Sequence, residues 1–126
     1  MTIAYWCVLA AALLPFAFTG AAKFSRGEQR YNNRKPREYL DQLEGWRRRA
    51  HWVQVNSFEA FPAFAAAVII AHLAGAAQGA IDGLAVAFIA LRVIYGLCYI
   101  FDKHVLRSTV WMVGMGCVVA LFVVAA

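Results

Sequence analysis

The sequence predicts an all-α fold, an integral membrane four-helix bundle, and three observations support this. Of the 126 residues, 63% are hydrophobic and 15% are charged, against about a quarter charged in an average soluble domain. Several apolar runs are long enough to cross a bilayer of about 30 Å. Nine of the twelve Lys and Arg residues fall in one stretch, from Lys23 to Arg49. The length allows a single domain, 1–126, whose thin interior favours packing against further copies of the chain.

The first span is expected at about residues 3–22. No basic residue precedes it and no clear cleavage site follows it, so we expect a retained helix rather than a removed signal peptide. The polar loop at about 23–49 comes next, with a short helix expected between Glu38 and Gly45. By the positive-inside rule this basic loop stays in the cytoplasm, which places both termini outside. The net charge of +5 therefore has a juxtamembrane origin and indicates contact with lipid headgroups, not with nucleic acid.

The second span, at about 50–75, carries polar side chains that are unusual in a membrane-spanning helix. At about 100° per residue, Arg49, Trp52, Asn56 and Glu59 lie on one stripe of this helix. An ionised carboxylate in hydrocarbon costs at least a few kcal/mol, so such groups usually turn toward protein or a water-filled cavity. The rest of the chain is expected to supply partners for this polar face.

The third span, at about 82–101, has a polar face as well, formed by Arg92, Tyr95, Tyr99 and Asp102. The fourth span is expected at about 108–126. Counted from the cytoplasmic surface, Glu59 and Arg92 both lie on the order of 13 Å deep. We therefore predict that they form an ion pair, within one chain or across a subunit boundary. Such a pair could line a ligand site, or it could be a structural clamp that fixes helix register.

Three segments together resemble the MAPEG family, the membrane-associated proteins in eicosanoid and glutathione metabolism. They are RAHWVQVNSFEAFPAF in the second span, RVIYGLCY in the third and LRSTVW at the start of the fourth. The most specific part is Asn-x-x-Glu-x-x-Pro, formed by Asn56, Glu59 and Pro62. The resemblance covers nearly the whole chain. The sequence is similar to bacterial members of the family, and this similarity implies a location in a bacterial inner membrane.

The resemblance implies a homotrimer that binds reduced glutathione between subunits, near the cytoplasmic side. It implies that Arg107 stabilises the thiolate, with Ser108 beside it. A free thiol has a pKa of about 8.5 and needs nearby positive charge to ionise at neutral pH. The implied activity is that of a transferase or peroxidase, with a hydrophobic electrophile entering from the lipid. Residues expected to bind glutathione are Arg49, Asn56, Glu59, Arg92, Tyr95 and Tyr99.

The sequence departs from glutathione-using relatives in two places. Trp52 stands where they have an arginine, one turn before the Asn, and Arg49 lies a further turn back. The spacing from Tyr99 to Arg107 is one residue shorter than in at least some active members. Two first-loop cations, Lys23 and Arg26, are further candidates for contact with glutathione.

Two other classes of function stay open. A small multi-span transporter could use Glu59 to exchange protons for hydrophobic cations, and a MAPEG-like protein could lack glutathione chemistry altogether. Because of these two alternatives, the sequence alone does not decide whether the chain is an enzyme. No metal site is expected, because the three histidines do not converge and the three cysteines, scattered in apolar segments, are expected to be packing residues: His51, His72, His104, Cys7, Cys98 and Cys117.

Overall fold

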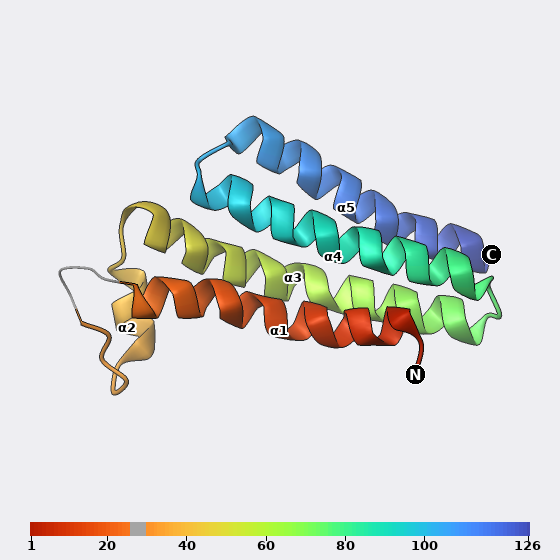
Figure 1. The fold of residues 1–126 in the computed structure, drawn as a ribbon, viewed down its shortest axis with the longest axis horizontal. Helices are drawn as coiled ribbons and strands as arrows, with labels where there is room; N and C mark the ends of the chain where they lie inside the picture. The colour runs from red at the N-terminus through yellow and green to blue at the C-terminus, as the bar shows by residue number, and fades with distance from the viewer. Residues whose placement is uncertain (26–29) are drawn as a thin grey trace.

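Four long helices form an antiparallel bundle in the structure, a computed structural model that describes residues 1–25 and 30–126 (Figure 1). Each of the four is long and apolar enough to cross a membrane, and the described residues include no strand. The prediction of an all-α four-helix fold is therefore confirmed. The long helices are α1 (Ile3–Phe24), α3 (Gly45–Leu73), α4 (Gln78–Ile100) and α5 (His104–Ala125), and a short α2 spans Pro36–Asp41.

The helices alternate in direction, so both termini lie at one end of the bundle and α2 lies at the other (Figure 1). We call the end with α2 and the α4–α5 turn the basic end, and the opposite end the terminal end. α1 packs against α3 and α4, while α5 packs against α4 and α3. The termini share one side of the bundle because the number of long helices is even.

Three of the long helices begin earlier than the sequence analysis expected. α3 begins at Gly45, which has a φ of +61° in the left-handed region that glycine adopts without strain. The three arginines at 47–49 thus lie inside the first turns of α3 instead of in the loop. α4 begins at Gln78 and α5 at His104, each four residues before the expected position. The short helix expected between Glu38 and Gly45 corresponds to α2, which begins and ends earlier, at Pro36 and Asp41. The fixed φ of Pro36 suits the first helical turn.

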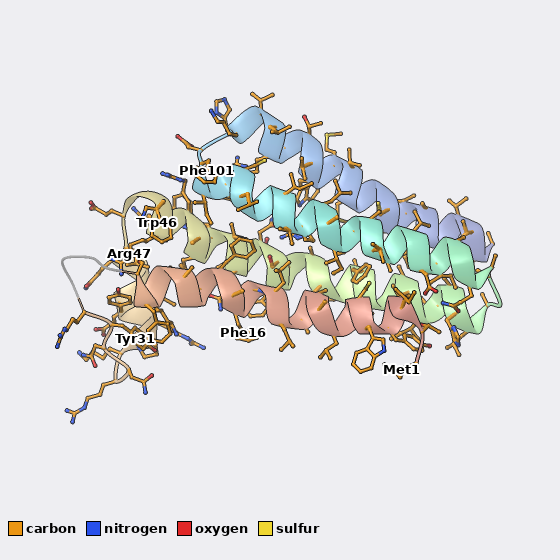
Figure 2. The ribbon with its side chains drawn as sticks, in the orientation of Figure 1. Met1, Phe16, Tyr31, Trp46, Arg47 and Phe101 are labelled. Atoms are coloured by element: carbon orange, nitrogen blue, oxygen red, sulfur yellow. The ribbon has the colours of Figure 1, made fainter. Side chains whose placement is uncertain are left out.

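The core consists of small residues with a few large rings. Phe64 and Phe88 stack with their ring centroids 4.0 Å apart, and both are buried. Alanines such as Ala67 and Ala85 are buried beside them, which lets the helices approach closely, as membrane helices do. Large apolar side chains cover the outer faces instead: Phe16 of α1 projects away from the bundle (Figure 2) and is 56% exposed. This apolar exterior fits a lipid surrounding.

Two arginines at the start of α3 bind the last carbonyls of neighbouring helices at the basic end. Arg47 donates from Nε to the carbonyl oxygen of Ala22 at 2.9 Å, and from a terminal nitrogen to the hydroxyl of Tyr39. Arg49 donates twice to the carbonyl oxygen of Ile100, at 3.1 and 2.8 Å. Carbonyls at a helix C-terminus lack partners within the helix and favour nearby cations. Figure 2 shows Arg47 at this end with Tyr31, Trp46 and Phe101, and Met1 at the other.

A carboxylate performs the matching task at the terminal end. Asp82 of α4 accepts a hydrogen bond at 2.8 Å from the backbone N–H of Ala4, in the first turn of α1. The same oxygen accepts a hydrogen bond from Gln78 at 2.8 Å, and Gln78 is hydrogen-bonded to the ring of His72 at 3.0 Å. Asp82 thus caps a helix other than its own and ties the start of α1 to α4.

We predict that Asp82→Ala destabilises the protein by about 1 kcal/mol or more, the usual cost of a lost helix cap. In detergent, thermal unfolding should then begin roughly 3 to 6 °C lower. Asp82→Asn, which keeps an acceptor oxygen, should lie between wild type and the alanine variant. The control is Asp41→Ala, at an exposed carboxylate of α2. Equal shifts for Asp82→Ala and Asp41→Ala would contradict the capping role.

Candidate functional site

Arg92 is the most buried cation of the described chain, 5% exposed in the middle of α4. Its guanidinium donates to Asn56 Oδ1 at 3.0 Å and to Ser57 Oγ at 2.9 Å, both on α3. Glu59 is exposed and forms no ion pair within the described residues. The predicted Glu59–Arg92 ion pair within the chain is therefore wrong, and an amide and a hydroxyl hold the cation instead.

The rotation of α3 explains this difference. The buried stripe of α3 runs through Val53, Ser57, Ala60 and Phe64, at helical spacing. Glu59 lies about 100° away from Ala60 and so faces outward. Sequence reasoning missed Ser57 because it matched charges by depth alone. The apolar spacing that includes Ser57 was the signal that could have found it.

Two tyrosines of α4 and two arginines form a continuous row of stacked groups. The Arg92 guanidinium lies 4.3 Å from the ring centroid of Tyr95, and that ring lies 5.7 Å from the ring of Tyr99, nearly edge-on. On the other side of Tyr99, the Arg107 guanidinium lies 4.4 Å from the ring centroid. A cation over an aromatic face is stabilised by the ring quadrupole. The row connects a buried cation in α4 with a surface cation in α5.

A groove follows this row along the outer surface of α3, α4 and α5. It consists of two adjoining open cavities that share Asn56, Tyr95 and Tyr99. The first, of about 430 Å³, is completed by four residues of α5: Arg107, Ser108, Trp111 and Met112. The second, of about 310 Å³, is completed by three residues of α3: Trp52, Val55 and Glu59. We call these the Arg107 half and the Glu59 half of the groove.

The polar groups of the Arg107 half are available to a ligand. Within the described residues, the Arg107 guanidinium forms no hydrogen bond or ion pair and only stacks on Tyr99. Ser108 donates its hydroxyl proton to the carbonyl oxygen of His104 at 3.1 Å. Its oxygen can still accept a hydrogen bond. This half therefore presents a free cation beside phenol groups, an arrangement that suits an anion.

The remaining candidates lie away from the groove walls. Arg49 is bound to the Ile100 carbonyl and lines neither cavity. Lys23 donates to the hydroxyl of Tyr31 at 3.2 Å and lies over its ring, while Arg26 lies outside the described residues. The structure thus gathers Asn56, Glu59, Tyr95, Tyr99, Arg107 and Ser108 in one groove, places Arg92 behind it, and leaves Arg49 outside.

A comparison with protein-family models decides the identity of the chain. The model of the MAPEG family matches residues 3–126, which is essentially the whole sequence. The chain belongs to the MAPEG family. Comparisons with curated proteins and with solved structures gave no match. Family membership and the four apolar helices together make this an integral membrane protein.

In this MAPEG protein, the bond between Ser57 and Arg92 should contribute strongly to stability. A hydrogen bond to a buried charged group is worth about 1.5 to 3 kcal/mol. Ser57→Ala should therefore lower the midpoint of thermal unfolding by several degrees or more. The matched control is Ser108→Ala, because that exposed hydroxyl bonds only to its own helix. The arrangement would be refuted if the two alanine variants unfolded at the same temperature.

Proposed function

We propose that this protein is a membrane-bound, glutathione-dependent transferase or peroxidase that acts on hydrophobic electrophiles. The observation that carries the proposal is the free guanidinium of Arg107 in the wall of a cavity of about 430 Å³. A thiol is a weak nucleophile until it ionises, and a nearby cation favours the thiolate. Membership of a family of membrane-associated proteins in eicosanoid and glutathione metabolism supports the same assignment.

The two halves of the groove match the charges of glutathione, which has a thiol, an ammonium group and two carboxylates. Arg107 would hold the sulfur, with the hydroxyl groups of Tyr95 and Tyr99 nearby. Glu59, exposed and without an ion pair in the described chain, would receive the ammonium group. Asn56 directs its carbonyl oxygen to Arg92, which leaves its NH₂ group as a donor for the peptide.

The chemistry then needs an apolar acceptor beside the sulfur. Trp111 is 41% exposed and Met112 is 68% exposed, and both line the Arg107 half. In the transferase reaction the thiolate forms a carbon–sulfur bond and a leaving group departs or the adduct takes up a proton. In the peroxidase reaction the thiolate attacks the terminal oxygen of a hydroperoxide, the O–O bond breaks, and the alkoxide leaves and takes up a proton. The sulfenic acid that remains reacts with the thiol of a second glutathione to form the disulfide and water.

We further propose that the protein is a homotrimer, in which a neighbouring subunit covers the groove. Glu59 is a carboxylate on the outer surface of a membrane span, and exposure of such a group to lipid costs at least a few kcal/mol. A groove that is open in one subunit would become enclosed at a subunit boundary. The basic end would face the cytoplasm of a bacterial cell, with both termini outside the inner membrane, because cytoplasmic loops are enriched in Lys and Arg.

One observation favours a second candidate, a proton-coupled transporter of hydrophobic cations. Arg92 does not neutralise Glu59 in this structure, so the carboxylate is free to exchange a proton for a cationic substrate. Proton-dependent uptake of a hydrophobic cation into vesicles, abolished by Glu59→Gln, would mark this class. Thiol conjugation without such uptake would mark the enzyme.

For the enzyme, we predict that Arg107→Ala lowers kcat/KM for conjugation of glutathione to a chlorodinitrobenzene by about a hundredfold. Loss of one group that stabilises a reacting anion typically costs 10² to 10³ in rate. The assay is the absorbance of the conjugate, with purified protein in detergent. Arg37→Ala is the control, since it removes the same charge from an exposed position in α2.

A wild-type protein that conjugates no faster than buffer with any hydrophobic electrophile tried would contradict the proposed function. An Arg107→Ala variant that retains the wild-type rate would contradict the role of Arg107, because the thiolate would then be stabilised elsewhere.

A further inference from the structure

The arginine cluster at the start of α3 divides into two engaged residues and one free residue. Arg47 and Arg49 each donate to a backbone carbonyl of a neighbouring helix. Arg48, between them, is exposed and forms no hydrogen bond or ion pair within the described residues. Successive helical residues point about 100° apart, so Arg48 cannot share the direction of either neighbour. Its positive charge is therefore available to bind a ligand.

Arg48 lines neither cavity itself but contacts Trp52, a wall residue of the Glu59 half. The Arg48 guanidinium lies 5.3 Å from the ring centroid of Trp52, one turn further along α3. Trp52 itself lines the Glu59 half, and its ring lies 6.0 Å from the ring of Tyr99. The indole is therefore a platform between the guanidinium and the cavity. The attraction between the Arg48 guanidinium and this ring also restricts where that cation can move.

The groove consequently has opposite charges along one face of α3. Arg48, Trp52, Asn56 and Glu59 are spaced at i, i+4, i+8 and i+11, which keeps them on one stripe. From Arg48 to Glu59 the helix rises about 16 Å. A fully extended tripeptide spans about 10 to 11 Å, and the long arginine side chain makes up the difference. The stripe suits a peptide with a cation at one end and an anion at the other.

We propose that Arg48 binds the carboxylate at the end of the thiol peptide remote from its ammonium group, and that Trp52 is its positioning residue. This inference rests on the proposed function, because it concerns the same ligand. It assigns the anion anchor to a residue that the sequence pattern did not single out. The sequence pattern singled out Arg49 instead, but the guanidinium of Arg49 donates its hydrogen bonds to the Ile100 carbonyl oxygen.

The test compares reduced glutathione with its glycine monoethyl ester, which lacks the carboxylate in question. Binding of both ligands is measured by calorimetry on the detergent-purified protein, for wild type, Arg48→Ala, Trp52→Leu and the charge-matched control Arg37→Ala. In wild type and in Arg37→Ala, the ester should bind roughly tenfold more weakly, since a charge-assisted hydrogen bond is lost. In Arg48→Ala, glutathione should bind as weakly as the ester, and the ester should be unaffected.

The Trp52 variant and the double variant test the platform. Trp52→Leu should reduce the preference for glutathione over the ester, and adding it to Arg48→Ala should leave the ratio of the two affinities unchanged. A preference for glutathione that persists in Arg48→Ala would overturn the inference while leaving the proposed function intact. If wild type bound neither ligand, the proposed function and this inference would both fail.

Discussion

A buried cation in a membrane span constrains the whole arrangement. Arg92 lies inside the bundle, where a charge without partners is costly. Asn56 and Ser57 satisfy it from α3, so these two helices are held in one register and one rotation. Since Tyr95 stacks on the guanidinium, its ring is fixed as well. The row of rings and cations that ends at Arg107 therefore depends on the contact between Arg92 and α3.

The contacts at the helix ends meet a second requirement: backbone N–H and C=O groups within a membrane need hydrogen-bond partners in the protein. Arg47 and Arg49 supply donors to the C-terminal carbonyls of α1 and α4, while Asp82 supplies an acceptor to the first turn of α1. These contacts also decide which charges are left for a ligand. Arg107, which lines the groove, and Arg48, which contacts its wall residue Trp52, carry no such structural bond within the described residues.

The fold could be predicted from the sequence because span length and hydropathy are properties of each segment alone. Part of the groove could also be predicted, because residues spaced by helical turns, such as Tyr95 and Tyr99, must share a face. The partners of the charged side chains could not be predicted. Glu59 and Arg92 lie at similar depth, yet depth says nothing about helix rotation, and Arg49 turned out to face a carbonyl rather than the groove. Such pairings depend on how two helices are rotated against each other, which no single segment encodes. The roles of the groove residues in binding stay predictions.

The most direct measurement is the ultraviolet absorbance of the thiolate of reduced glutathione bound to the detergent-purified protein, followed as a function of pH. A free thiol ionises with a pKa of about 8.5. If Arg107 stabilises the thiolate, the bound ligand should keep its thiolate absorbance well below that pH in wild type and lose it in Arg107→Ala. A bound thiol that titrates like the free one in the wild-type protein would contradict the account.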